Sequence, residues 1–451
     1  MQLAVFIVGC FVVAFTLNRR PIALVTVALG LRFFVPSVAS VVFTGTSGDA
    51  QLHPASYFLA VAFVVTLLVR PRRVRGELSA RPMFYGGLAV VWALGMATTL
   101  LQVGPRNAIV FIDTFGFGVL LCVMIGVAID GSPERGRTVA RWYVALAASQ
   151  AIIALIQWSA GRTIFWERYM ASYYWWSPTA ERTSGTVGAW LDLATLLAVA
   201  VPLTASIRRV WLRFAISILL IVGILLAQGR TALVVAGACV VALVLFSSMR
   251  FGLRLLCATA IAGVAVYIAS SPLIEGISGR NSTDTLSGQA REQAAAFALA
   301  NLPSQPLFGT GFGSNGDTRM FGLISSFENG YLMYAWDFGI PCAVFMFVLL
   351  ASRLLVPRRR RLVPGSLLSL ASALFLIGTF SGLQTPGPTS WVLFVAIGLS
   401  AVRPRDRDPA GAMTVETAET QLLKPSGRSS VQASPSSADR RPRPTQGESP
   451  S

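Results

Sequence analysis

Charged residues are scarce in this chain of 451 residues, which holds 20 acidic residues, one histidine and a single lysine. Charged residues make up 13% of the sequence, whereas a soluble domain carries about a quarter. The only histidine, His53, has no neighbouring cysteine, so it cannot form a zinc site. All five cysteines lie inside apolar runs, where small packing residues are expected rather than disulfides or metal ligands. The composition therefore argues against a soluble domain and against a zinc or disulfide framework.

Long apolar runs take the place of charge, and hydrophobic residues make up 54% of the chain. A run of about 18 or more apolar residues indicates a transmembrane helix, because only a helix satisfies its own backbone in lipid. The sequence predicts an all-α, polytopic integral membrane protein with about 12–13 transmembrane helices. The spans are expected at 3–17, 22–43, 55–69, 83–101, 108–129, 142–160, 187–206, 214–227, 231–248, 252–270, 327–350, 365–381 and 390–402.

The loops between these spans alternate in charge. One set carries 20 arginines against three acids, and the other carries eight arginines against eight acids. Because cytoplasmic loops collect arginine, the first set is expected inside the cell and the second outside. This clustering accounts for the net charge of +17 without a nucleic-acid partner. We therefore expect a multi-pass protein of the cell (inner or plasma) membrane, in contact with membrane lipid.

The apolar stretch 214–248 is expected to form a hairpin. As one helix it would be about 50 Å long, which exceeds a hydrocarbon core of roughly 30 Å. Both flanks are basic and therefore cytoplasmic, so the chain must turn outside, at Gln228-Gly229-Arg230. Arg230 is then placed at the outer membrane surface, where a charge is costly unless it is used.

Residues 1–402 are expected to form the membrane domain, with two long outer loops at 161–186 and 271–326. Long loops in a compact protein are usually functional or disordered. The first contains the aromatic residues 173–176, which either belong to an interfacial belt or form a platform for sugar rings or lipid. The second contains a helical run at 291–302. Residues 403–451, rich in Pro, Ser and Arg, are expected to be a disordered cytoplasmic tail.

The predicted outer face carries arginines and isolated carboxylates. No nucleotide loop, zinc helix, Ser-His-Asp arrangement or Asp-x-Asp pair stands where it would operate. Arginine binds diphosphate through two hydrogen bonds and stays charged at any pH, and a nearby carboxylate can act as general base toward a sugar hydroxyl. The candidate residues on this face are Arg182, Arg230, Arg291, Arg319 and Glu328.

Several motifs in this region resemble the O-antigen ligase and polymerase family. The turn at 228–232 is similar to the family's arginine turn, and 182–186 is similar to its Arg-x-x-Gly segment before a span. The resemblance continues through Arg291, the glycine-rich segment 306–313 and Glu328-Asn329-Gly330-Tyr331-Leu332. The order of these motifs and their placement on one face make the combination more specific than any single motif.

This resemblance extends over roughly residues 140–350 and implies a membrane glycosyltransferase that acts outside the cytoplasm. Members of the family transfer a polyprenyl-diphosphate-linked glycan to a sugar or glycolipid acceptor, and they need neither ATP nor metal. We therefore expect no cofactor. In ligases a histidine often precedes the asparagine that corresponds to Asn329. Glu328 stands at that position, which favours a polymerase, or ligation to another acceptor.

The resemblance implies a role for each candidate residue. Arg230 and Arg291 would neutralise the leaving diphosphate, and Glu328 would deprotonate or orient the acceptor hydroxyl. The residues expected to bind donor or acceptor are Arg182, Arg319, Asn329 and Tyr331. The glycines at 309, 311 and 313 are expected to set turns rather than to cradle phosphate, because no strand precedes them.

Two other classes of function remain open from the sequence: a polysaccharide or lipid-linked sugar exporter, and a non-catalytic membrane scaffold. Ionisable residues inside spans mark either a transport pathway or a paired site. The four such residues are Arg32, Asp113, Asp192 and Asp337. No internal repeat of the kind found in transporters is evident, and Arg32 and Asp113 are candidates to pair with each other. No oligomeric state is predicted.

Overall fold

The computed structural model describes residues 1–45, 52–171, 182–246, 252, 285–316, 322–323, 327–355 and 363–401. These residues belong to one compact unit, Met1–Arg405. Every regular element in the described ranges is helical, which confirms the predicted all-α class. The predicted span 252–270, apart from residue 252, and the predicted tail 403–451 lie outside the described residues.

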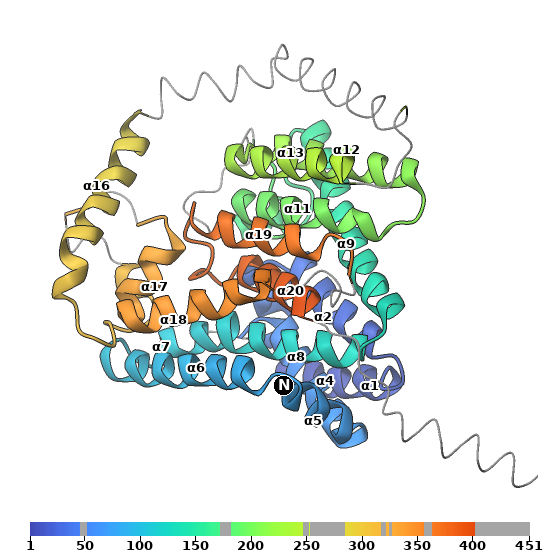
Figure 1. Ribbon diagram of the computed structural model, residues 1–451, viewed down its shortest axis with the longest axis horizontal. Helices are drawn as coiled ribbons and strands as arrows, with labels where there is room; N and C mark the ends of the chain where they lie inside the picture. Colours follow the sequence, from blue (N-terminus) through green and yellow to red (C-terminus); the bar gives the residue numbers. More distant parts are fainter. Residues whose placement is uncertain are drawn as a thin grey trace, which may run out of the picture. The chain divides into compact units, whose positions relative to one another are not determined.

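The first part of the chain forms helices that mostly begin at a proline (Figure 1). Proline suits the first helical position because its missing N–H would have no partner there. The helices are α1 (Gln2–Thr16), α2 (Pro21–Phe34), α3 (Val41–Thr44), α4 (Pro54–Val69), α5 (Pro71–Ser79), α6 (Pro82–Gln102), α7 (Pro105–Phe111), α8 (Phe117–Ile129) and α9 (Pro133–Ala160). A π-helical turn, Ile112–Gly116, joins α7 to α8.

The second part begins after α9 and ends in the last described helix. Its helices are α10 (Glu167–Met170), α11 (Trp190–Leu203), α12 (Val210–Leu226), α13 (Arg230–Leu245), α16 (Thr285–Asn301), α17 (Gly330–Phe338), α18 (Ile340–Ala351), α19 (Ser366–Ile377) and α20 (Thr389–Ala401). The expected helical run at 291–302 lies in α16, and a short 3-10 turn, Leu302–Ser304, follows it.

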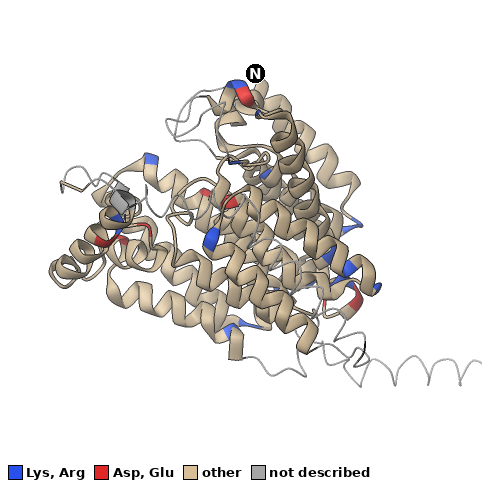
Figure 2. Cartoon of the chain, turned by 90° about the horizontal axis from the view of Figure 1, so that it is seen from above, with Lys and Arg blue, Asp and Glu red and all other residues tan. Residues whose placement is uncertain are grey.

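Three helical stretches are long and apolar enough to cross a membrane, namely Pro82–Gln102, Pro105–Ile129 and Pro133–Ala160. Two bent pairs of helices raise this number to five if each pair is one span. Seven further apolar helices of 10–17 residues lie where other spans are expected. Figure 2 shows long stretches of helix without a charged residue. The predicted class, a polytopic membrane protein, is confirmed, although fewer spans of full length are present among the described residues than the 12–13 expected.

One predicted hairpin and one predicted single span have different outcomes in the structure. The hairpin expected within 214–248 is present, because α12 and α13 pack together on either side of a turn at Gln228-Gly229. The single span expected at 327–350 is instead two helices, α17 and α18, that break at Gly339. Gly339 has φ +78°, and a Cβ there would overlap the carbonyl of Leu307. Pro341 at the second position of α18 has no N–H to continue the helix, and the segment around Leu307 lies close to Gly339, so both contribute to the break.

Helix α11 lies at the centre of the second part and contacts α9, α12, α13, α19 and α20 (Figure 1). Its residues from Asp192 to Leu203 are all buried. A helix that is apolar on all sides belongs inside a bundle. On another side of the bundle, α20 packs closely on α8, where Gly118 receives Phe394 and Gly398 receives Ile125. Small residues permit such close approach between membrane helices.

Candidate functional site

The segment before α11 meets the turn between α12 and α13. The backbone N–H of Thr183 donates to the carbonyl of Leu226 at 3.1 Å, and Arg182 Nε donates to Gln228 Oε1 at 3.1 Å. Gln228 has φ +53°, a conformation that a residue with a side chain adopts only at a cost. Next to it, a Cβ at Gly229 would overlap Ala194 of α11. These contacts hold the turn in one conformation.

Two of the predicted arginines flank this turn. The guanidinium of Arg182 lies over the ring of Trp190, 5.0 Å from its centroid, which fixes the arginine further. Arg230 is the first residue of α13 and its side chain is exposed. A cation at a helix N-terminus opposes the helix dipole, so helix stability does not account for an arginine there. An anion bound at this turn would be favoured by both side chains and by the dipole.

The remaining two predicted catalytic residues form an ion pair. Arg291 Nε lies 2.5 Å from Glu328 Oε2, although Arg291 belongs to α16 and Glu328 lies in the connection before α17. The side chain of Arg291 is 53% exposed and that of Glu328 is 25% exposed. Glu328 has φ +44°, in the left-handed region. The pair is therefore open to solvent and is carried on a strained backbone.

Packing between α16 and α17 brings this pair together. On α16, Ala294 and Ala298 are fully buried and lie one turn apart on the same face. They form a separate small apolar cluster with Phe327, Met333 and Trp336. The small alanine side chains permit close contact, so the side chain of Arg291 reaches the residue that precedes Asn329.

Asn329 and Tyr331 have structural contacts in the chain itself. The Oδ1 atom of Asn329 accepts from the backbone N–H groups of Tyr331 and Leu332, at 3.0 and 3.2 Å, and so caps α17. The hydroxyl of Tyr331 donates to the carbonyl of Leu374 in α19, and its ring packs edge-on against Phe347. These contacts fix the start of α17, which follows Glu328 directly in the chain, and the role of both residues in binding substrate stays a prediction.

The glycine-rich segment wraps around the carboxylate of Asp337. Gly313 N–H donates to Asp337 Oδ2 at 2.8 Å, and Asn315 Nδ2 and Ser314 Oγ donate to Oδ1 at 2.8 and 3.1 Å. The three expected turn glycines, at 309, 311 and 313, have φ of +72°, +90° and +77°. A Cβ at Gly309 would overlap the backbone at Asp337. The glycines therefore set turns, and the carboxyl group that they surround belongs to the chain.

Residues 215–347 match the O-antigen ligase family model. This matched segment begins in α12 and ends in α18, so it contains Arg230, Arg291, Glu328 and Asp337. The predicted resemblance to this family is confirmed over that range. Arg182 lies outside the matched segment. No curated protein matches the chain.

Residues 378–388, which lie after the segment that matches the O-antigen ligase model, join α19 to α20. This loop and the first residue of α20 make hydrogen bonds to three of the ionisable residues expected inside spans. Gln384 Nε2 donates to Asp337, and Thr389 Oγ1 donates to Asp192 Oδ1 at 2.5 Å. Arg32 Nη2 donates to the carbonyls of residues 386 and 387, at 3.1 and 2.8 Å. The 378–388 loop therefore links the Asp337 carboxylate of the ligase match to buried charges outside it.

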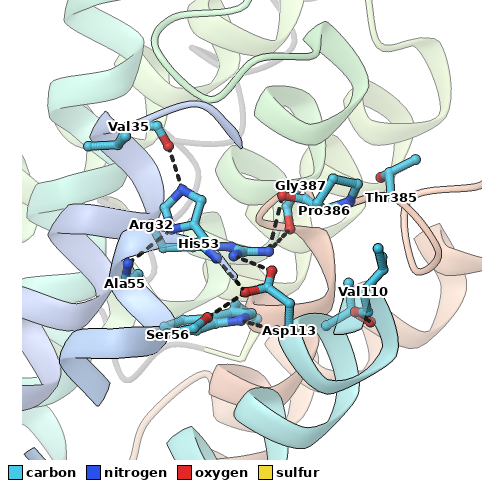
Figure 3. Close-up of polar contacts among 12 residues, drawn as sticks. Arg32, Val35, His53, Ala55, Ser56, Val110, Asp113, Thr385, Pro386 and Gly387 are labelled. Carbon is cyan, nitrogen blue, oxygen red and sulfur yellow. Dashed lines mark hydrogen bonds and ion pairs between the residues drawn. The ribbon is translucent and has the colours of Figure 1, made fainter. Parts of the chain in front are cut away.

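The pairing of Arg32 with Asp113 is present. Arg32 Nη1 lies 2.7 Å from Asp113 Oδ2, and both side chains are almost completely buried. Figure 3 shows the guanidinium between this carboxylate and the carbonyls of Pro386 and Gly387. The carboxylate also accepts from Ser56 Oγ at 2.6 Å. A paired site therefore accounts for these two charges without a transport pathway.

His53 completes this cluster as a neutral residue. Its backbone N–H donates to Asp113 Oδ1 at 2.8 Å, its Nδ1 accepts from Ala55 N–H at 3.1 Å, and its Nε2 lies 2.7 Å from the carbonyl of Val35 (Figure 3). Burial, with the nearby charge of Arg32, lowers the pKa of His53 to about 3. Nε2 is therefore the donor to Val35. Within the described ranges, no group of three or more His, Cys, Asp or Glu side chains is placed to hold a metal ion.

Some of the predicted residues fall outside the described ranges, and one loop that contacts the buried charges was not predicted. Arg319 and the aromatic residues 173–176 lie outside the described residues. Sequence reasoning missed Gln384 and the carbonyls of the 378–388 loop, which carry no charge and so give no signal in a hydropathy reading. The run Pro386-Gly387-Pro388 is the one local sign that a structured turn stands there.

Proposed function

We propose that the protein transfers or polymerises a glycan carried on polyprenyl diphosphate, at the extracytoplasmic face of the membrane. The observation that carries this proposal is the ion pair between Arg291 and Glu328, 2.5 Å apart within the residues that match O-antigen ligase. In this pair Arg291 is the cation proposed to bind diphosphate, and Glu328 is the proposed base. The alternation of basic and mixed loops supports the outer placement of this pair.

The chemistry requires one base and a stabilised leaving group. The acceptor hydroxyl oxygen attacks the anomeric carbon of the donor sugar, and the bond from that carbon to the diphosphate oxygen breaks. The hydroxyl proton passes to the carboxylate of Glu328. The diphosphate stays on the lipid and gains negative charge, which the guanidinium groups of Arg230 and Arg182 stabilise at the turn before α13.

Arg291 serves both parts of this reaction. It contacts Glu328 through Nε, which orients the carboxylate toward the acceptor. A guanidinium has five N–H donors in a fixed plane, so donors remain for an oxygen of the diphosphate. Lysine has the same charge but no fixed plane. It would hold the carboxylate without orienting it.

The test uses purified protein and a lipid-diphosphate-linked oligosaccharide. Glu328→Gln keeps the size of the side chain but removes the base, and we expect it to lower the transfer rate by about 100-fold or more. Arg230→Ala is expected to lower the rate as well. Arg168→Ala is the matched control, because Arg168 is an exposed arginine of the predicted outer loop before α11. We expect it to leave the rate unchanged.

Two results would count against the proposal. Full activity of Glu328→Gln and Arg230→Ala at normal protein levels would exclude the mechanism. Movement of the lipid-linked sugar across the membrane without bond formation would favour an exporter instead. Glu328, in place of the histidine common in ligases, favours the polymerase form. Shortened surface glycan in a deletion strain supports that form, and full-length but unattached glycan supports a ligase.

A further inference from the structure

A pocket of about 590 Å³ is lined by five arginines, none of which belongs to the candidate site. These arginines are Arg19, Arg20, Arg70, Arg73 and Arg135. They come from the connection between α1 and α2, from the junction of α4 and α5, and from the first turn of α9. We call this feature the arginine pocket.

Helix α4 separates the arginine pocket from the buried charge cluster. The helix starts directly after His53, which contacts Asp113, and it ends at Val69, directly before Arg70, which lines the pocket. Its 16 residues correspond to a length of about 24 Å. The pocket therefore lies at the opposite end of the helices from the 378–388 loop. The sequence assigns this end to the cytoplasm.

The positive charge of the pocket is only partly neutralised. Among the described residues that line it, none is acidic. The adjacent carboxylate of Asp130 lies 3.5 Å from Arg73 and 3.3 Å from Arg135, so one acid serves two of the five arginines. The tendency of inner loops to collect arginine explains their number. It does not require that arginines from separate loops converge on one cavity.

Apart from Thr26 and Thr138, the rest of the lining is apolar. It includes the first residues of α2, among them Ile22 and Val27, and the indole of Trp142 on α9, which is 50% exposed. A free phosphate ion would bind the arginines but make no favourable contact with apolar side chains. A phospholipid would contact both parts of the pocket, because its phosphate binds arginine through two hydrogen bonds while its acyl chains pack on apolar side chains.

We propose that the arginine pocket binds the phosphate of an anionic phospholipid on the cytoplasmic side of the membrane, with the acyl chains against Trp142. Tryptophan prefers the level of the lipid headgroups, which agrees with the position of Trp142 next to the arginines. Lipid binding at the arginine pocket is independent of the proposed glycosyltransferase reaction.

The test measures the unfolding temperature of the delipidated full-length protein in detergent. Phosphatidylglycerol is expected to raise it in a saturable manner, whereas phosphatidylcholine and inorganic phosphate are expected not to. The variant Arg19→Gln/Arg20→Gln removes two cations of the pocket. We expect it to weaken the apparent affinity for phosphatidylglycerol by about tenfold or more. Its unfolding temperature without lipid should match the wild type, because both residues are exposed.

The matched control is Arg208→Gln/Arg209→Gln. It removes two exposed arginines of the same predicted face, outside the pocket, and so makes the same change in charge. We expect it to leave the lipid effect intact. An equal loss in both variants would overturn the proposal in favour of general attraction between charges. Stabilisation by inorganic phosphate to the same extent would overturn the lipid assignment in favour of a free anion.

Discussion

Replacement of Arg32 by methionine is expected to destabilise the helical bundle strongly. The change leaves the buried carboxylate of Asp113 without its cation, and it removes the donor to the carbonyls of Pro386 and Gly387. Loss of one partner from a buried ion pair costs about 3–5 kcal/mol. That is a large part of the 5–15 kcal/mol, roughly, that stabilises a typical folded protein.

A double-mutant cycle separates the ion pair from general damage to the core. Asp113→Asn retains an acceptor for the hydroxyl of Ser56 and for the backbone N–H of His53, but it leaves the cation of Arg32 unpaired. The double variant Arg32→Met/Asp113→Asn has no unpaired buried charge. We expect it to cost about 2–3 kcal/mol less than the sum of the two single variants.

Unfolding by sodium dodecyl sulfate in detergent micelles, followed by circular dichroism, measures each free energy. The control cycle is Arg137→Met/Glu134→Gln, which concerns a solvent-exposed pair at 2.9 Å. We expect no measurable coupling there, because exposed pairs contribute little. Additive costs for Arg32 and Asp113, within about 0.5 kcal/mol, would refute the conclusion that these two charges stabilise the fold as a pair.

Two further predictions concern stability. His53 is the only histidine in the chain, and its pKa is lowered to about 3 in the fold. In the unfolded chain His53 has an ordinary pKa of about 6.5 and binds a proton below that pH, whereas in the folded chain it stays neutral. The free energy of unfolding therefore falls by roughly 2 kcal/mol between pH 6.5 and 5. The difference between wild type and His53→Asn across a pH series measures it, and identical pH profiles would contradict it. Gly339→Ala is expected to destabilise the protein by about 2–4 kcal/mol, because its φ of +78° and the contact with Leu307 both oppose a side chain. Gly237→Ala in α13, where a Cβ meets no other atom within 4 Å, should leave the unfolding free energy unchanged or raise it, and equal effects would contradict the explanation.

The sequence could predict what depends on short-range pattern and on charge. The hairpin at Gln228-Gly229 follows from the length of an apolar run between two basic flanks. The break at Gly339 gives no signal in hydropathy, which is the same in one helix or two, but Pro341 two residues later is a local sign of it, because proline cannot donate within a continuing helix. The close approach of Leu307, which is a contact of the folded chain, could not be predicted.

The candidate site shows the same division. Arg230, Arg291 and Glu328 could be selected because a charge on an apolar chain is conspicuous. The 378–388 loop could not, because it binds its three partners through an amide, a hydroxyl at its edge and two backbone carbonyls. The pairing of Arg32 with Asp113, which was left open from the sequence, depends on the packing of α2 against the helices that follow α7.

The charges near the predicted outer face divide into those that stability explains and those that it does not. Asp113 and Asp337 are buried, and several donors satisfy each of them, so both are accounted for as anchors. Glu328 differs, because its backbone lies at φ +44° while its side chain pairs with the half-exposed Arg291. Such strain costs about 1–3 kcal/mol, whereas an exposed pair contributes about 0–1 kcal/mol. This ion pair alone does not offset the strain, and strained residues of this kind cluster at functional sites, which agrees with the role proposed for Glu328 in the reaction.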